Sequence, residues 1–233
     1  MGTSNISVGD EPSQGMSQEL RQELIEETAL RLAGTKEFKR LMTQYECAIM
    51  EIEAKLNVLN AEFSLRYDRN PFESIESRLK GVNSIVEKMM RRGMSVTVDN
   101  IEAELFDIAG IRVICSFKED IYRLADLLVQ QDDVLLLARK DYIENPKPNG
   151  YRSLHMIFDI PIFLSEGKKH MKVEVQFRTI AMDFWASVDH KLKYKKQISN
   201  PEEVVSRLKK CADSLADMDD EMEAIRQSID RSE

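Results

Sequence analysis

The stretch that decides the fold, residues 107–115, reads DIAGIRVIC. Its apolar residues Ile111, Val113 and Cys115 recur at every second position, which is the period of a β-strand with one buried face. Arg112 lies on the opposite face of the same predicted strand. The stretch therefore predicts a strand that packs one face on the core and presents charge on the other.

The remainder of the chain places this strand in a mixed sheet. Residues 154–162 and 172–177 show the same period of two, and a shorter apolar run at residues 135–138 suggests a further strand. Strong helix formers with apolar residues every three or four positions occupy residues 18–65, 73–91, 118–131, 180–193 and 201–228. We expect an α+β fold, in which a mixed β-sheet of about five strands is covered by helices, with flanking N- and C-terminal helices.

The chain of 233 residues is long enough for one sizeable domain with helical appendages. Residues 1–16 are rich in Gly, Ser, Asn and Pro without apolar periodicity, so we expect them to be disordered. We expect N-terminal helices over residues 17–69, a core domain over residues 70–198 and a C-terminal helix over residues 199–233.

Composition and charge exclude several classes of protein. No apolar run approaches the ~20 residues of a membrane-spanning helix, and no basic and apolar signal opens the chain, so we expect a soluble, cytoplasmic protein without a membrane partner. Three cysteines without CxxC spacing exclude a disulfide framework and a zinc ribbon. The net charge of −8 argues against a polybasic nucleic-acid coat. Residues 78–92 nevertheless carry five bases against one acid, which suits a small polyanion.

The basic window forms a regular pattern on the helix predicted over residues 73–91. Lys80, Ser84 and Lys88 follow one another at a spacing of four, and Arg91 falls on the same stripe. Such a row suits a chain of phosphates. A solvated basic surface produces the same pattern, so the row by itself leaves both interpretations open.

Two acidic residues are candidate metal ligands. Asp107 stands where a predicted helix runs into a strand, and Glu174 lies on the polar face of the strand predicted over residues 172–177. Because Mg²⁺ sites use one or two carboxylates together with substrate phosphates, Asp107 and Glu174 on neighbouring strands can hold one Mg²⁺. Glu174 can also act as a general base. A helix-end carboxylate and a solvent-exposed strand face explain the same residues without a metal.

The segment over residues 140–155 combines bases, aromatic residues and a tight turn before it enters a strand. Tyr151 can stack on a base, while Lys147 and Lys140 can neutralise phosphates. His155 taken alone is explained equally by a structural role. The sequence contains no GxxxxGKS/T, GxGxxG or GxSxG motif, so P-loop, dinucleotide-binding and hydrolase-elbow functions lose their main support.

Four motifs in one order carry a family resemblance over residues 78–195. They read SRLKGVNSIVEKMMRRG, DIAGIRVIC, KDYIENPKPNGYRSLH and VEVQFRTIAMDFWASVDHKLKYK. The sequence resembles the RelA/SpoT-type nucleotide pyrophosphokinase domain in its stand-alone form, the small alarmone synthetase. The resemblance implies a nucleotidyltransferase-like synthetase fold and GTP diphosphokinase activity in the stringent response. In that reaction the β,γ-pyrophosphate of ATP moves to the 3′-hydroxyl of GTP or GDP, giving pppGpp or ppGpp and AMP.

The resemblance also implies roles for individual residues. It assigns ATP binding to Arg78, Lys80, Ser84, Lys88, Arg91 and Arg112. It assigns GTP or GDP binding to Lys140, Lys147, Asn149, Tyr151, His155 and Gln176, with Tyr151 on the guanine and Arg178 nearby. Asp107 and Glu174 are then the catalytic carboxylates that hold Mg²⁺, and Glu174 takes the proton of the acceptor hydroxyl.

Features outside the motifs complete the expectation. By resemblance the flanking helices build a homotetramer. Some relatives are regulated by (p)ppGpp or by single-stranded RNA, and in this chain a site for the product is expected near Phe72, Ser74 and Asp183. Asp189 stands where the family usually has Glu, which leaves the acceptor preference open. The long members of the family also contain a hydrolase domain, which is marked by a His-Asp pair. The sequence contains no such pair, so no hydrolase domain is expected.

Two alternative functions remain open at this point. The first is a toxic relative that makes adenosine alarmones, (p)ppApp, or pyrophosphorylates the 3′ end of tRNA. A tRNA acceptor favours a broad basic surface, which the net charge of −8 does not suggest. The second is a non-catalytic nucleotide- or RNA-binding module. The presence of both Asp107 and Glu174 argues against a pure binder, which needs no pair of metal ligand and base.

Overall fold

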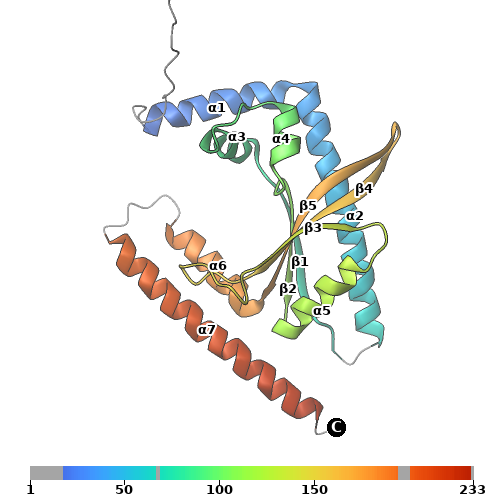
Figure 1. Ribbon diagram of the computed structural model, residues 1–233, viewed down its shortest axis with the longest axis vertical. Helices are drawn as coiled ribbons and strands as arrows, with labels where there is room; N and C mark the ends of the chain where they lie inside the picture. The colour runs from blue at the N-terminus through green and yellow to red at the C-terminus, as the bar shows by residue number, and fades with distance from the viewer. Residues whose placement is uncertain (1–17, 67–68, 194–199, 232–233) are drawn as a thin grey trace, which may run out of the picture.

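The computed structural model describes residues 18–66, 69–193 and 200–231 (Figure 1). The segment expected to be disordered, residues 1–16, and the end of the fourth motif, Tyr194 and Lys195, lie outside these ranges. Within the described ranges, no helix is both long enough and apolar enough to cross a membrane.

The centre of the molecule is a mixed sheet of five strands, as the sequence predicts. The strands are β1 (Phe72–Leu79), β2 (Ala109–Cys115), β3 (Leu135–Asp141), β4 (Leu154–Leu164) and β5 (Gly167–Thr179). Their order across the sheet is β1-β2-β5-β4-β3, so β5 is the middle strand. β2 and β5 are parallel, whereas the other three neighbouring pairs are antiparallel.

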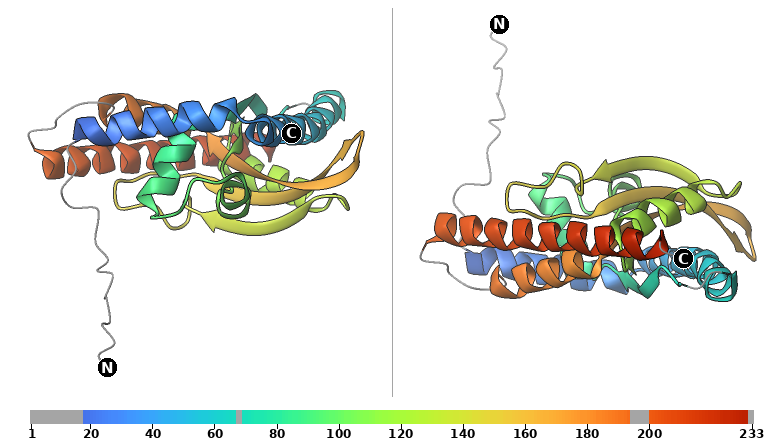
Figure 2. Two further views of the ribbon diagram at one scale, coloured as in Figure 1. Left: turned by 90° about the horizontal axis from the view of Figure 1, so that it is seen from above. Right: turned by 90° about the horizontal axis from the view of Figure 1, so that it is seen from below.

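Helices cover both sides of the sheet (Figures 1 and 2). They are α1 (Gln18–Gly34), α2 (Lys36–Arg66), α3 (Val82–Arg91), α4 (Val98–Glu104), α5 (Lys118–Val129), α6 (Ile180–Lys193) and α7 (Pro201–Asp230). In Figure 1, α2 and α5 lie on one side of the sheet, and α6 and α7 lie on the other. The helices predicted at both ends of the chain and after β2 and β5 are confirmed.

The apolar core lies between the sheet, α2 and α5. Alternate residues of the central strands, such as Val113, Val175 and Phe177, are fully or almost fully buried, as are Ile52 and Leu56 of α2. The α2 helix contacts β1, β2, β4 and β5. Its apolar stripe is therefore covered by the chain's own sheet, and the opposite face of the sheet is left for polar side chains.

The prediction of one helix over residues 73–91 is wrong. Phe72–Leu79 forms β1, and only Val82–Arg91 is helical. Glu, Ser and Arg in this segment suit a helix, but pairing with β2 decides the outcome, because strand formation depends on neighbouring strands more than on intrinsic preference. As an edge strand with several exposed residues, β1 lacks the apolar alternation by which a strand is recognised.

The same correction divides the predicted basic stripe. Arg78 belongs to the polar face of β1, Lys80 lies in the connection after it, and Ser84, Lys88 and Arg91 belong to α3. The helix expected just before Asp107 is the short α4, whose range the sequence did not predict. Its start is marked by the Thr97 hydroxyl, which accepts a hydrogen bond from the backbone N–H of Asn100.

Candidate active site

Two rows of side chains cross all five strands on the polar face of the sheet. One row consists of the register partners Glu76, Arg112, Gln176, His155 and Lys140. The next row consists of Arg78, Gly110, Glu174, Ile157 and Ala138. Because β5 is the middle strand, Gln176 and Glu174 occupy the centre of the two rows.

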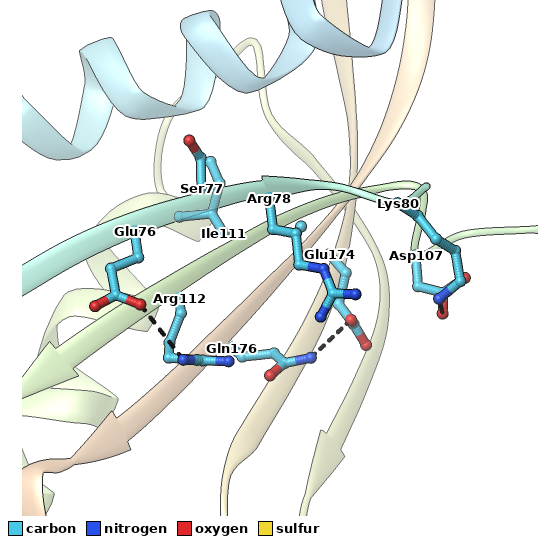
Figure 3. A pocket seen from close by; sticks show the side chains of 10 residues that line it. Glu76, Ser77, Arg78, Lys80, Asp107, Ile111, Arg112, Glu174 and Gln176 are labelled. Carbon is cyan, nitrogen blue, oxygen red and sulfur yellow. Dashed lines mark hydrogen bonds and ion pairs between the residues drawn. The ribbon is translucent and has the colours of Figure 1, made fainter. Parts of the chain in front are cut away.

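A cavity of about 490 Å³ lies over the half of this face built by β1, β2 and β5 (Figure 3). Its charged lining consists of Arg78, Lys80, Arg112, Glu76, Asp107 and Glu174. Figure 3 shows Arg112 beside Glu76 at one end and Lys80 beside Asp107 at the other. Gly110 keeps the floor open, since a Cβ there would meet only the carbonyl oxygen of Arg78, at 3.5 Å. We call this space the first cavity.

Asp107 is held by two lysines, one from the connection after β1 and one from α3. Lys80 Nζ and Lys88 Nζ donate to the same oxygen, Oδ2, at 2.9 and 2.6 Å. Burial opposes ionisation of the carboxyl, but the hydrogen bonds and charges of Lys88 and Lys80 outweigh it and lower the pKa of Asp107. The second oxygen, Oδ1, is buried without a hydrogen-bond partner. It is the atom of this carboxylate that is left to bind a cation.

The loop that carries Asp107 is fastened at the end of α4. Lys172 Nζ, on β5, donates to the carbonyl oxygens of Ala103 and Glu102 at 3.1 and 3.4 Å and lies 4.1 Å from the centre of the Phe106 ring. Arg92 donates to the carbonyl oxygen of Glu104 at 3.0 Å. Cations at the carboxyl end of a helix are favourable. These two contacts fix the backbone just before Asp107.

Glu174 is engaged at both of its oxygens. His155 Nδ1 lies 3.1 Å from Oε1, and Gln176 Nε2 donates to Oε2 at 2.8 Å. Burial would raise the pKa of Glu174, but His155 and the Gln176 amide outweigh it, and the pKa is lowered. The negative charge of Asp107 acts in the opposite direction on Glu174. A cation shared by the two carboxylates would relieve this repulsion.

A second cavity of about 220 Å³ lies on the other side of Glu174, over β3 and β4. Its polar lining consists of Lys140, Tyr142, Lys147, His155 and Glu174. Lys147 Nζ lies 4.6 and 4.8 Å from the ring centres of Tyr142 and Tyr151. Glu174 therefore belongs to both cavities, and each of them is lined by cations that suit a polyanion.

The loop that carries Tyr151 is packed against α7. Gly150 has a φ of +90°, and a Cβ at this position would lie 2.5 Å from the Cβ of Ala212. Arg152 donates to the Ala212 carbonyl oxygen at 3.3 Å and to Asp213 Oδ1 at 3.2 Å. The backbone N–H of Tyr151 donates to Asn149 Oδ1 at 3.3 Å. Glycine is needed here because the turn approaches the helix closely in a left-handed conformation.

The structure brings most of the predicted site residues to the two cavities. Arg78, Lys80, Asp107, Arg112, Glu174 and Gln176 line the first cavity; Lys140, Lys147, His155 and again Glu174 line the second. Tyr151 lies beside the second cavity, in contact with His155, and Lys88 reaches the first through Asp107. Ser84 and Arg91 lie on α3 outside the cavity lining, and the side chain of Asn149 bonds within its own turn.

Sequence reasoning missed Tyr142 and Lys172. Tyr142 lies inside the quoted third motif, and its place beside Tyr151 in a tight loop was the available signal. Asp183, expected near a product site, accepts from Arg178 at 2.9 Å and lies 3.4 Å from Arg112. Within the described part of the chain, His, Cys, Asp and Glu side chains form no cluster of three or more that could hold a metal. A metal here would need substrate phosphates as further ligands.

The fold and the site define a class of protein: an α+β domain that can hold two polyanions on one sheet face, on either side of a shared carboxylate. Residues 77–199 match the family model described as "Region found in RelA / SpoT proteins". The match spans more than half of the 233 residues. The chain belongs to the RelA/SpoT family, as the four motifs indicate.

Individual relatives agree with this assignment. The chain is 40% identical over 195 residues to "GTP pyrophosphokinase YwaC" of Bacillus subtilis, covering 84% of this chain and 93% of the relative. Small alarmone synthetase 1 of Bacillus subtilis, bound to its product pppGpp, matches with a TM-score of 0.76 and 35% identity over 84% of this chain and 99% of that chain. The same protein bound to AMPCPP matches with a TM-score of 0.70 and 31% identity over 83% and 99%.

Proposed function

We propose that this protein is a GTP pyrophosphokinase that transfers the β,γ-pyrophosphate of ATP to the 3′-hydroxyl of GTP or GDP, forming pppGpp or ppGpp and AMP. The observation that carries the proposal is that Glu174, on the middle strand of the sheet, lines both cavities, each of which also has lysine or arginine side chains in its lining. A transfer between two nucleotides needs such a junction, because donor and acceptor must meet in line. The relatives named for this activity cover most of the chain.

We assign the first cavity to ATP. Arg78, Lys80 and Arg112 would bind its phosphates and neutralise charge as the pyrophosphate leaves AMP. Lys88 would hold Asp107 and, with Ser84 and Arg91, form the outer edge of this site on α3. The main support is the concentration of cations around a cavity whose floor is kept open by Gly110.

We propose that Mg²⁺ is bound by Asp107 and Glu174. Asp107 Oδ1 is buried and has no hydrogen-bond partner, and both carboxyl groups have lowered pKa values, so both are ionised and able to bind a cation. Bound there, Mg²⁺ would neutralise part of the charge on the substrate phosphates. The two lysines on Asp107 would keep the carboxylate in place while ATP enters.

We assign the second cavity to GTP or GDP. Tyr151, next to Tyr142, would stack on the guanine, and Lys140, Lys147 and Asn149 would surround the nucleotide. His155 and Gln176 would orient Glu174, which would accept the proton of the 3′-hydroxyl. The hydroxyl oxygen then bonds to the β-phosphorus of ATP, and the bond from that phosphorus to the α-phosphate oxygen breaks.

We propose that the protein forms a homotetramer in the cytoplasm, where its nucleotide substrates are present. On α7, Met218, Met222, Ile225 and Ile229 recur at helical spacing with exposed fractions between 44% and 59%. A second copy would cover this stripe. Such an assembly would create the cleft between subunits where the resemblance implies regulation by product. Multi-angle light scattering tests it: Met222→Glu should shift the tetramer to smaller species.

The activity is tested by incubating the protein with γ-labelled ATP and Mg²⁺ and, separately, with GTP, GDP, no second nucleotide or bulk tRNA. Label in pppGpp or ppGpp is the expected result. Label in adenosine products or in tRNA would replace the proposal by the toxic function. If no label moves although both nucleotides bind, the protein is a binding module.

A further inference from the structure

Arg178 is the most deeply buried cation on the polar face of the sheet. It lies near the end of β5, and 5% of its surface is exposed. The resemblance expects Arg178 near the acceptor nucleotide. Its guanidinium instead contacts protein groups: Nη1 donates to Asp183 Oδ1 at 2.9 Å, and Nη2 donates to Tyr151 Oη and Gln176 Oε1 at 2.8 and 2.9 Å. A buried cation of this kind holds its partners in place.

These contacts close a ring of five side chains. In order around the ring they are Glu174, Gln176, Arg178, Tyr151 and His155. Tyr151 Oη lies 2.8 Å from His155 Nε2, and His155 Nδ1 lies 3.1 Å from Glu174 Oε1. The ring thus joins the aromatic residue assigned to the guanine with the carboxylate assigned to the proton transfer.

The chemistry of the two ends fixes the hydrogen bonds made there. A guanidinium only donates, so Tyr151 Oη accepts from Arg178, and the same oxygen lies 2.8 Å from His155 Nε2. Ionised Glu174 only accepts, so His155 Nδ1 carries a hydrogen and donates it to Glu174 Oε1. On the other arm, Gln176 Oε1 accepts from Arg178, so its Nε2 donates to Glu174 Oε2. Both arms begin at Arg178 and end at Glu174.

We propose that Arg178 is a positioning residue that, through these two arms, holds His155 and Gln176 against Glu174 and so sets the orientation of the Glu174 carboxylate. The inference deepens the proposed function and rests on it. Arg178 also reaches the wall of the first cavity, because its partner Asp183 lies 3.4 Å from Arg112. One buried guanidinium therefore aligns groups that belong to both substrates without contacting either of them.

Kinetics separate this role from direct nucleotide binding. Arg178→Met should lower kcat by about 100-fold, as expected when a reacting group is displaced by about 1 Å, and should change the KM for ATP by less than about threefold. Arg178→Lys keeps a hydrogen-bond donor, so its kcat should be about tenfold higher than that of Arg178→Met. Arg40→Lys, at an exposed pair with Glu166, is the matched control and should leave kcat unchanged. A raised acceptor KM with wild-type kcat would overturn the proposal.

Tyr151→Phe removes one link of the ring and leaves the ion pair between Arg178 and Asp183 in place. It should lower kcat by about tenfold, which corresponds to one hydrogen bond. Combined with Arg178→Met, it should add no further loss, because both changes open the same arm. Independent effects that multiply would contradict an action of Arg178 through Tyr151. This variant keeps the test available if Arg178→Met does not fold.

Nitrogen NMR of the imidazoles tests the ring without any activity. The chain has three histidines, so the signals of His155 can be assigned with His155→Gln. In the wild type, His155 Nδ1 should carry a hydrogen whose signal is shifted downfield by its hydrogen bond to Glu174, and this shift should decrease in Tyr151→Phe, where the imidazole is held less closely. An Nδ1 that carries no hydrogen in the wild type would overturn the proposal even if the enzyme makes pppGpp. Hydrogen on Nδ1 in a protein that transfers no pyrophosphate would refute the proposed function alone.

Discussion

The two cavities of the site differ in how their walls are held together. The first takes Arg78, Lys80, Asp107 and Arg112 from residues 78–112 and is closed by Glu174 and Gln176 of β5. The loop beside the second is tied to a helix much later in the chain, because Arg152 bonds to the carbonyl oxygen of Ala212, 60 residues away. The ATP half thus depends on the sheet and the loops between its strands, whereas the acceptor half also depends on the docking of α7.

This contrast has a consequence for regulation and stability. The α7 helix presents an exposed apolar stripe on one side and holds the Tyr151 loop on the other. Changes at α7 should therefore act on the acceptor half and leave the ATP half intact. The predictions that follow test this division, beginning with the residue that belongs to both halves.

Glu174→Gln should have the largest effect, because Glu174 is the residue at which the two cavities meet. We expect kcat to fall by about 1,000-fold, within the range of general base catalysis, while ATP and GDP each bind within about threefold of wild type. Calorimetry and steady-state kinetics measure the two quantities separately. Glu76→Gln, which alters only the first cavity, is the matched control. Loss of binding with an unchanged kcat would remove Glu174 from the junction.

Lys172→Met should affect only the ATP half. Without its contacts to the carbonyl oxygens of Glu102 and Ala103, the loop before Asp107 is less well fixed. The Mg²⁺ concentration at half-maximal rate should rise by about tenfold, as for other residues that orient metal ligands, with no change in acceptor KM. Lys168→Met, on the same strand, should behave as wild type. An altered acceptor KM in Lys172→Met would contradict the division.

Two glycines allow a direct comparison of the halves. Gly150→Ala places a Cβ 2.5 Å from that of Ala212 at a φ of +90°, so it should lower the free energy of unfolding by about 2 kcal/mol and raise the acceptor KM. Adding Ala212→Gly removes the clash and should restore part of the loss. Gly110→Ala meets only one ordinary contact and should stay within about 0.5 kcal/mol of wild type. Denaturant titration compares the three variants, and equal losses would argue against close packing on α7.

Substitution of Asp219 should have the smallest effect, and the pH dependence of that effect tests the contact between α7 and Thr179. The Asp219 carboxylate accepts from the Thr179 hydroxyl at 2.7 Å, and burial raises its pKa above the usual value. The native state therefore binds this proton more readily than the unfolded chain, and ionised Asp219 costs stability above the raised pKa. Asp219→Asn should raise the Tm near neutral pH, and the gap to wild type should narrow as the pH falls through that pKa. A gap that does not change with pH would show that the ionisation is not coupled to docking.

The sequence predicts the parts of this structure that depend on local pattern. The strands around Ile111, Val113 and Val175 follow from alternation, because one face of each is buried and the other is polar. The neighbouring places of Arg112 and Gln176 on the polar face also follow, since parallel strands with the same period bring their polar positions together. Asp107 was expected on a strand beside Glu174 but lies in the loop before β2, and it reaches the first cavity from there. The family motifs add residue roles that no periodicity contains.

The parts that the sequence did not predict depend on contacts between distant segments. β1 is a strand because β2 pairs with it, although its own residues suit a helix. Lys172 acts through carbonyl oxygens at the end of α4, a contact between segments about 70 residues apart that no local pattern indicates. Arg178 could be recognised as a polar-face residue, but its place in a closed ring required the positions of two strands, a loop and α6 at once.

The central claim is that the acceptor hydroxyl meets Glu174 where the two cavities join. A crystal structure of the protein with AMPCPP, Mg²⁺ and GDP tests it most directly. The account predicts AMPCPP in the first cavity, GDP in the second, and the 3′-oxygen of GDP about 2.6–3.2 Å from a carboxylate oxygen of Glu174. GDP bound in the first cavity, or a 3′-oxygen too far from Glu174 for a hydrogen bond or a single bridging water, would contradict it.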